Sequence, residues 1–477
     1  MTRRIGPFPF LSKVKSFIAT NLLVFNNTCM WMNMIKGESF RLTIGLILAA
    51  FVVFAPLFCE ESIAEKLDLP IHIHLTWQYN NMSSTITVTW QTRDSDSGNT
   101  VAYDNVSRNS APSLYRYSVI GTNHTYPGAS GGIHDVELSG LKPNSTYYFV
   151  CGGEKGGYSD ERSFRTAPIH SSHLRFVVGG DSRTNWSQRD NISRGMSKFN
   201  PSFVLFSGDL VTSGYNQTMW DSFFEGLHSY WIGSNSLTIP IIPCLGNHEQ
   251  NATNYYEQFA LPGNEQWYSL NWGKYVHITV LNSEADPSSA QLDWLENDLA
   301  SHGNYTWKFV LFHQPPFSSG KHDSWTEGQE YWCPLFDKYH VDIVFAGHDH
   351  NYERSKPINY TASKTSPQDT YSKGTMYIIS GGWGAPLYSN GSNWWTDYSS
   401  SIHHFVLVDI FTNGTLNLYA KDVSGSTFDE VIQKVPVIPE FPWNNILPIL
   451  VVATLLLAIV RKKLSSFYRG QTYSKYN

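Results

Sequence analysis

Two histidines separated by one residue follow an apolar run in the last third of the chain. The run at residues 341–345 suits a buried strand, and Gly347-His348-Asp349-His350 comes shortly after it. Alternate residues of an extended backbone point the same way, so His348 and His350 would face one small volume. Neutral imidazole is a common ligand of zinc, iron and copper. Taken alone, the motif is more often a surface loop that holds two histidines by chance, and the other candidate ligands of the chain reverse this preference in favour of a metal site.

Polar residues also follow four other apolar runs, at residues 174–179, 203–206, 239–243 and 308–312. The candidate ligands after these runs are, in order, Asp181, Asp209, Asn247 and His313. A single Gly-Asp pair is usually a turn, but turns do not explain five such sites in succession. Two carboxylates, one amide and three imidazoles form a nitrogen and oxygen ligand set for borderline metals.

The elements that would position these residues alternate along the chain. Residues 289–302 and 326–339 read as helices, and residues 276–281 add another buried strand. Such alternation is typical of a layered α/β domain, in which ligands bind beyond the carboxyl ends of the strands. We therefore predict one α/β domain with the candidate ligands along one edge of its sheets.

An all-β region precedes this domain. Short strands are predicted at residues 85–90, 115–119, 134–138 and 147–150, with turn residues between them, which predicts a sandwich with Trp90 in its core. Leu-Lys-Pro-Asn-Ser-Thr-Tyr, ending at Tyr147, resembles the tyrosine corner of fibronectin type III domains. We expect a platform packed against the second domain rather than an independent binding module.

The blocks GD, GD, GNHE, H and GHDHNYERS, in this order, resemble the calcineurin-like metallophosphoesterases. The flanking sandwich and the GHDHNYERS block are similar to the purple acid phosphatase branch, and the resemblance covers roughly residues 69–424. It implies a four-layer α/β metallophosphoesterase fold behind a fibronectin III-like sandwich. It also implies an acid phosphatase-like enzyme with two metal ions (iron, zinc or manganese) and a phosphorylated small-molecule substrate.

The resemblance also implies a role for each candidate residue. Asp181, Asp209 and His350 match ligands of the first metal, and Asn247, His313 and His348 match those of the second, with Asp209 bridging the two. The cations would lower the pKa of a bound water, and the resulting hydroxide would attack phosphorus.

Two further histidines match residues that handle the substrate. His248 matches a histidine that contacts the phosphate or protonates the leaving alkoxide. His322 resembles a histidine of the substrate pocket, and its alternative is a surface histidine.

The sequence departs from the purple acid phosphatase pattern at two positions. Thr212 stands where the family carries the tyrosine that binds ferric iron, so we predict a protein that is not purple and does not require ferric iron. Arg183 stands where other branches carry a histidine. This arginine would either hold a phosphate oxygen as a catalytic residue or form a structural salt bridge.

Composition and the apolar segments suggest where the protein acts. The chain has 477 residues and a net charge of −6, so we expect no nucleic-acid binding, and its five cysteines include no Cys-x-x-Cys metal motif. Residues 42–58 form a charge-free run that reads as a secretory signal or an uncleaved anchor, with a buried core helix as the alternative. Residues 446–460 form a second run, followed by a basic cluster.

Asn-x-Ser/Thr sequons, for example at Asn81, Asn105 and Asn144, are spread along the chain. Together with the apolar runs they lead us to expect an exported, glycosylated cell-surface protein, anchored in the membrane with its catalytic domain outside. The predicted divisions are a signal or anchor region at 1–64, the sandwich at 65–168, the catalytic domain at 169–435, and a linker, transmembrane helix and basic tail at 436–477.

Hydrolysis of phosphate monoesters is the leading hypothesis for function. A phosphodiesterase or nucleotidase on the same scaffold is an alternative, since aromatic residues of loops 215–235 and 381–397 could stack on a base. A non-catalytic surface binding protein with a decayed site is the third, and the retained ligand set argues against it.

Overall fold

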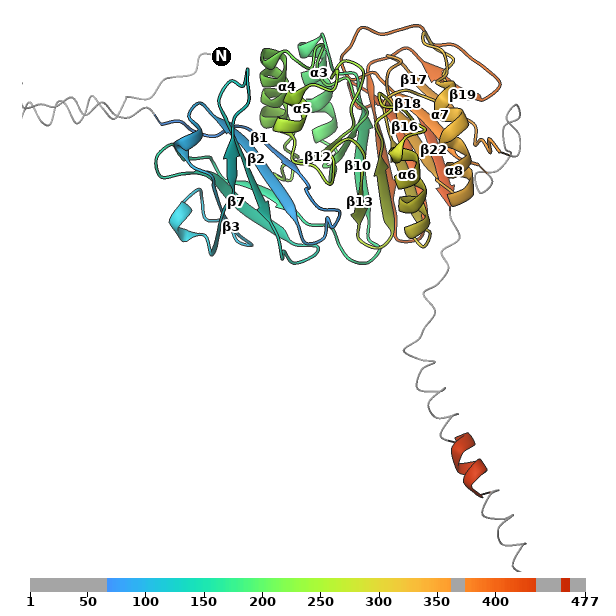
Figure 1. Ribbon diagram of the computed structural model, residues 1–477, viewed down its shortest axis with the longest axis horizontal. Helices are drawn as coiled ribbons and strands as arrows, with labels where there is room; N and C mark the ends of the chain where they lie inside the picture. Colours follow the sequence, from blue (N-terminus) through green and yellow to red (C-terminus); the bar gives the residue numbers. More distant parts are fainter. Residues whose placement is uncertain (1–66, 362–373, 435–455, 464–477) are drawn as a thin grey trace, which may run out of the picture. The chain divides into compact units, whose positions relative to one another are not determined.

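The structure, a computed structural model, describes residues 67–361, 374–434 and 456–463, and its first folded part is an all-β sandwich (Figure 1). One sheet has the order β1 (Ile71–Thr76), β2 (Ile86–Thr92), β6 (Gly132–Leu138), β5 (Thr122–His124). The other has the order β4 (Tyr117–Ile120), β3 (Thr100–Asp104), β7 (Thr146–Gly153), β8 (Gly157–Tyr158), and β9 (Arg162–Arg165) also pairs with β7.

The core of the sandwich contains the residues predicted for it. Trp90 is 1% exposed and stacks on the ring of His134, with 5.0 Å between centroids. The hydroxyl of Tyr147 accepts a hydrogen bond from the backbone N–H of Lys142 at 2.9 Å. This bond ties the strand back to the preceding loop, as in the predicted tyrosine corner.

The second part contains two sheets packed face to face. The first has the order β12 (Ile241–Pro243), β11 (Val204–Phe206), β10 (Leu174–Gly179), β20 (His404–Ile410), β21 (Thr415–Asp422), β22 (Thr427–Lys434). The second has the order β13 (Tyr268–Trp272), β14 (Val276–Val280), β15 (Trp307–Leu311), β16 (Ile343–Ala346), β18 (Met376–Ser380), β17 (Tyr352–Ser355), β19 (Thr396–Ser400). Phe176 lies between them, with its ring 5.5 Å from that of Phe309.

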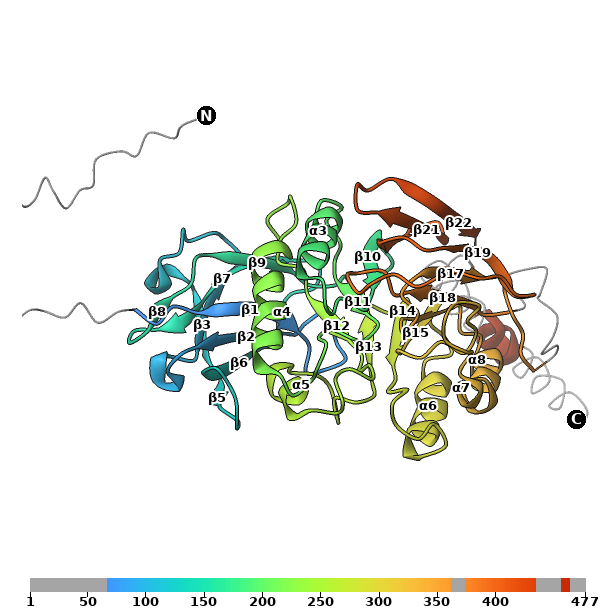
Figure 2. The same ribbon diagram turned by 90° about the horizontal axis from the view of Figure 1, so that it is seen from above.

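Helices cover the outer faces of these sheets (Figures 1 and 2). On one side lie α3 (Trp186–Ser197), α4 (Gln217–Tyr230) and α5 (Thr253–Gln258), and on the other lie α6 (Ala290–Ser301), α7 (Thr326–Tyr331) and α8 (Cys333–Tyr339). Strands β10, β11 and β12 run parallel, as do β14, β15, β16 and β18, so their carboxyl ends meet along one edge. The predicted α/β four-layer architecture behind an all-β sandwich is confirmed.

One predicted helix is wrong in its extent. Residues 326–339 form two short helices, α7 and α8, instead of one. Pro334 lies in the first turn of α8, where its missing N–H is tolerated, whereas inside a longer helix it would remove a hydrogen bond and clash with the preceding turn. The other predicted helix agrees with α6, which Ser289 caps by accepting a hydrogen bond from the N–H of Gln291.

The sandwich packs against α4 of the second part. The N–H of Ile73 donates to Nδ1 of His228 at 3.0 Å, and the ring of His74 stacks on Phe224 at 4.5 Å between centroids. The hydroxyl of Tyr126 donates to Oε1 of Gln217 at 2.6 Å. These contacts agree with the role of a packed platform.

His228 makes this contact sensitive to acid. Burial, together with the nearby charge of Arg162, lowers the pKa of His228 from 6.5 to about 3. Because protonated Nδ1 could not accept the Ile73 N–H, the contact stabilises the fold above pH 6.5, and this stability is lost as the pH falls from 6.5 toward 3.

We expect His228→Asn to reduce this acid sensitivity, since asparagine keeps an acceptor and does not titrate. Between pH 7 and pH 4.5 the melting temperature of the wild type should fall by roughly 2–4 °C more than that of the variant. Thermal unfolding at matched ionic strength measures the difference, and equal slopes for both proteins would refute it.

The predicted apolar segment at 42–58 lies outside the described residues, and so does the predicted segment at 446–460 apart from residues 456–460, which belong to a short exposed helix. In the described part of the chain, no helix combines the length and the apolar character needed to cross a bilayer. Three cysteines fall in that part, Cys151, Cys244 and Cys333, and all three are buried and free.

Candidate metal centre

Three candidate ligands lie in strained turns at the carboxyl ends of strands. Asp181, Asp209 and His348 have positive φ values of 60°, 53° and 69°. Such a backbone persists only where its surroundings hold it, and here the N–H of His348 donates to Oδ2 of Asp181 at 3.0 Å. The positive φ of His348 also means that the His-x-His segment is not extended, so the premise of alternating side chains is wrong. The two imidazoles instead enter adjoining ligand groups.

Asp181, Asp209 and His350 form the first group, with ligand atoms that all lie within 4.8 Å of one another. Nδ1 of His350 donates to the carbonyl of Pro386 at 2.7 Å, which leaves the lone pair of Nε2 directed into the group. Oδ1 of Asp181 is buried and has no hydrogen-bond partner among the described residues. A buried carboxylate oxygen without a partner is costly, and a cation at this point would satisfy it.

Asn247, His313 and His348 form the second group. Oδ1 of Asn247 lies 3.0 Å from Nε2 of His313 and 3.2 Å from Nδ1 of His348, and these two nitrogens are 3.2 Å apart. Nδ1 of His313 donates to the carbonyl of Ser207 at 2.7 Å, so its Nε2 faces the group. Oδ1 of Asp209 lies 3.4 Å from the same Nε2, which places this carboxylate between the two groups.

Glycine is required where the turns approach each other. At Gly208, which has a φ of 86°, an added Cβ would lie 2.8 Å from Nδ1 of His313. At Gly347 an added Cβ would lie 2.5 Å from Oδ2 of Asp181. A side chain at either position would therefore separate the ligands.

The charges of the centre suit cations. Burial opposes a charge on His313, yet the carboxylates of Asp209 and Asp181 raise its pKa to about 9. Burial and the neighbouring His313 lower the pKa of His348 to about 3. A proton on His313 thus balances the carboxylates, and a metal ion would displace it. Together with the Asp181 oxygen that has no hydrogen-bond partner among the described residues, this shows that the residues fit metal binding.

Glu249 supports the centre, although no role for it was predicted. Its buried carboxylate accepts hydrogen bonds from the N–H groups of Asp209 and Leu210, both at 2.9 Å, of Gly246 at 2.8 Å and of Val211 at 3.3 Å. Burial and the nearby Asp209 raise the pKa of Glu249 to about 8. The side chain clamps the turn after β11 to the turn after β12. Its only sequence signal was its place at the end of the GNHE block.

Two histidines border the ligands. Nδ1 of His248 donates to the carbonyl of Thr212 at 2.7 Å, and its Nε2 lies 3.9 Å from Oδ2 of Asp209. His322 stacks on His348 with 4.2 Å between ring centroids. The structure thus brings both predicted substrate residues to the centre.

Tyr388 is an additional member that the sequence did not reveal. Its ring stacks on His350 at 3.9 Å between centroids, and Nζ of Lys321 lies 3.8 Å from the centroid of the same ring. The tyrosine fixes the plane of a candidate ligand from a loop distant in sequence.

Arg183 contacts the first group directly. Its Nε donates to Oδ2 of Asp209 at 3.0 Å, and its Nη2 lies 3.1 Å from Nε2 of His350. Of the two roles considered for this residue, the structure contains a salt bridge, and the partner is the central carboxylate.

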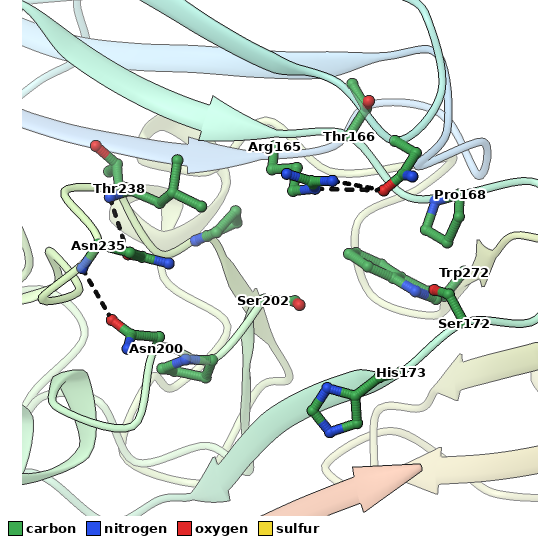
Figure 3. A pocket seen from close by; sticks show the side chains of 14 residues that line it. Arg165, Thr166, Pro168, Ser172, His173, Asn200, Ser202, Asn235, Thr238 and Trp272 are labelled. Atoms are coloured by element: carbon green, nitrogen blue, oxygen red, sulfur yellow. Dashed lines mark hydrogen bonds between the residues drawn. The ribbon is translucent and has the colours of Figure 1, made fainter. Parts of the chain in front are cut away.

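Cavities occur beside the centre and far from it. One of about 390 Å³ adjoins Asn247 and is lined also by Gln250, Gln266, Asn282 and Glu284. Another of about 210 Å³ lies at the seam between sandwich and catalytic domain, where it includes Arg165 and Trp272 but none of the candidate ligands (Figure 3). Of these two cavities, only the first includes a candidate ligand, Asn247.

A separate cluster of His277, Asp298 and His302 has ligand atoms close enough for a metal. Its two imidazole rings are nearly parallel, with centroids 3.8 Å apart, so their lone pairs do not point at one position. Asp298 already accepts hydrogen bonds from Ser269 at 2.8 Å and Thr279 at 2.9 Å. This cluster is a hydrogen-bonded part of the fold.

Comparisons with known proteins match both parts of the chain. The family model for the N-terminal domain of purple acid phosphatases matches residues 70–166, and that for calcineurin-like phosphoesterases matches residues 169–352. The chain is 32% identical over 318 residues to probable purple acid phosphatase 20 of Arabidopsis thaliana, covering 61% of this chain and 69% of the relative. It is 29% identical over 354 residues to acid phosphatase type 7 of Mus musculus, covering 65% of this chain and 77% of the relative.

A solved structure has the same fold. It is a purple acid phosphatase from yellow lupin (Lupinus luteus) seeds, which aligns with a TM-score of 0.68 and 22% identity over 78% of this chain and 75% of that chain.

Proposed function

Since this chain belongs to the purple acid phosphatase family and is a metal-dependent phosphoric ester hydrolase, we propose that it hydrolyses phosphate monoesters of small molecules outside the cell. The observation that carries this proposal is the position of Asp209 between two ligand groups. Asp181, Asp209 and His350 would hold one ion and Asn247, His313 and His348 the other, with iron, zinc or manganese as candidates. When bound, such ions lower the pKa of water and neutralise charge on the phosphoryl group.

The side chains around the ligands would handle the substrate. The Nδ1–H of His248 is held by the carbonyl of Thr212, so Nε2 is free to contact a phosphate oxygen or to protonate the leaving alkoxide. His322 is one-third exposed and stacks on His348. From this position its imidazole would contact the substrate ester at the second ligand group.

The cavity beside Asn247 favours an uncharged, polar leaving group. Its lining contains the amides of Gln250, Gln266 and Asn282, and its only charged member is the carboxylate of Glu284. Amides hydrogen-bond hydroxyl groups, whereas the carboxylate repels additional phosphates.

A substrate pair tests the ester class. A monoester presents three terminal oxygens to the ions and to His248, whereas a diester presents two. We expect para-nitrophenyl phosphate to have a kcat/KM at least about 10-fold above that of bis(para-nitrophenyl) phosphate, a difference of about 1.4 kcal/mol. A preference for the diester would overturn the proposal and favour the phosphodiesterase alternative.

The nucleotidase alternative has less support. In loop 381–397, Tyr388 stacks on His350, and Trp395 is 9% exposed and packs against Phe317. Tyr215 of the other loop is 67% exposed and stays available for a base. A kcat/KM for a nucleoside monophosphate well above that for glycerol phosphate would favour the nucleotidase.

We further propose that the protein is exported and anchored by its terminal apolar segments, with the catalytic domain outside. The apolar runs at 42–58 and 446–460 and the basic Arg461-Lys462-Lys463 support this orientation. Protease treatment of intact cells tests it: cleavage of the catalytic domain is expected, and full protection would contradict the orientation.

Iron loading gives a spectroscopic test of the departure at Thr212. Threonine cannot form the tyrosinate bond that colours ferric iron, and the exposed Tyr215 hydroxyl lies near the carbonyl of Gln250, at 3.4 Å. We expect iron-loaded protein to lack a strong visible charge-transfer band and Thr212→Tyr to gain one. A strong band in the wild-type absorption spectrum would show that another tyrosine binds iron.

A further inference from the structure

We propose that the guanidinium of Arg183 competes with the first metal ion for the ligand atoms of Asp209 and His350. The first ligand group therefore binds its ion more weakly than the second group does. Phosphate, by drawing the guanidinium away, strengthens binding of that first ion. This inference rests on the two-metal centre proposed above. Its basis is the position of one guanidinium among the ligand atoms of a single group.

The contacts of Arg183 fall on two atoms that a metal ion would need. Oδ2 of Asp209 accepts from Nε at 3.0 Å, and Nε2 of His350 lies 3.1 Å from Nη2. Because Nδ1 of His350 already donates to Pro386, Nε2 has its lone pair free and accepts from the guanidinium. An ion bound through this Nε2 would have to displace the arginine.

The second group has no such competitor among the described residues. The atoms of Asn247, His313 and His348 that face this group lie 3.0–3.2 Å from one another. At the first group, by contrast, the guanidinium of Arg183 lies within hydrogen-bond distance of two ligand atoms and opposes a second cation there.

The charge of Arg183 must therefore act on the two groups unequally. The side chain of Arg183 is 14% exposed, so solvent screens its charge weakly. Its guanidinium contacts ligand atoms of the first group, Oδ2 of Asp209 and Nε2 of His350. We expect the first group to bind a divalent ion roughly 100-fold more weakly than the second.

Phosphate would release this competition. A phosphate dianion gives the guanidinium a better partner than the imidazole of His350, with two parallel N–H···O bonds. Arg183 would turn from Nε2 of His350 to the anion, and the first group would become free for its ion. By linkage, phosphate then strengthens binding of the first ion, and that ion strengthens binding of phosphate equally.

Calorimetric titration of metal-depleted protein with Zn²⁺ tests the proposal, with metal content after dialysis as a second readout. Arg183→Met removes the charge and keeps the length, and Arg183→Lys keeps the charge. Arg175→Met is the matched control, since Arg175 pairs with Asp409 on β20 outside the centre. In the wild type, the lysine variant and the control, we expect two Zn²⁺-binding steps whose dissociation constants differ about 100-fold. In Arg183→Met we expect two steps of similar dissociation constant. Inorganic phosphate should tighten the weak step in the wild type and have little effect in Arg183→Met.

The outcomes separate this inference from the proposed function. Two ions of equal affinity in the wild type, or a weak step that Arg183→Met leaves unchanged, would overturn the role of Arg183 and leave the two-metal centre intact. Failure to bind any metal would overturn the centre itself. If circular dichroism shows that Arg183→Met does not fold, the wild-type titration with and without phosphate decides, and no effect of phosphate would refute the coupling.

Discussion

Replacing Asp209 with asparagine should lower kcat for para-nitrophenyl phosphate by about 10³-fold or more and reduce bound metal below two ions per chain. Its carboxylate lies between the two ligand groups, and it also pairs with Arg183 at 3.0 Å. Asparagine keeps the shape but removes the charge that both ions would share. A 10³-fold loss of kcat corresponds to about 4 kcal/mol of activation free energy, and we expect a loss of this size if the variant no longer holds both ions in place.

The comparison needs a control that loses a carboxylate elsewhere. Asp293 on the exposed side of α6 is suitable, because Asp293→Asn should leave metal content and kcat unchanged. Metal content by mass spectrometry and initial rates measure both effects. Wild-type metal content and rate in Asp209→Asn would show that this carboxylate does not hold the ions.

Replacing Glu249 with alanine should lower the free energy of unfolding by about 3–5 kcal/mol and also impair hydrolysis. The substitution leaves four buried N–H groups without an acceptor, two of them on Asp209 and Gly246. The turns after β11 and β12 would then separate, and Asp209 and Asn247 would lose their alignment.

Glutamine distinguishes shape from hydrogen bonding at this position. Glu249→Gln fills the same volume but offers one oxygen instead of two, so we expect an intermediate loss of stability. Urea unfolding of both variants, with Glu154→Ala on the exposed surface as control, measures the effect. Wild-type stability in Glu249→Ala would show that the clamp contributes nothing.

The sequence predicted the ligand-bearing turns because each follows a short apolar strand. Each of the strands β10, β11, β12, β15 and β16 is followed by a side chain that can bind a metal ion, and ordinary turns do not explain such a succession. The fold class followed from the same alternation. The premise behind the His-x-His motif was wrong, since an extended backbone was assumed where His348 has a left-handed conformation.

Other features could not be predicted, because they depend on distances between remote segments. A buried Glu249 that accepts four N–H groups has the same local sequence as an exposed glutamate. The stacking of Tyr388 on His350 joins loops on either side of β17 and β18. The two roles of Arg183 were equally compatible with the sequence, and only the distance to Oδ2 of Asp209 revealed the salt bridge.

Exhaustive chelation followed by metal readdition tests whether the converging ligands hold ions that are essential for ester hydrolysis. We expect metal-depleted protein to stay folded, to lose hydrolysis of para-nitrophenyl phosphate, and to regain it as zinc, manganese or iron is added up to two ions per chain. Undiminished hydrolysis by protein that contains no detectable metal would contradict this expectation.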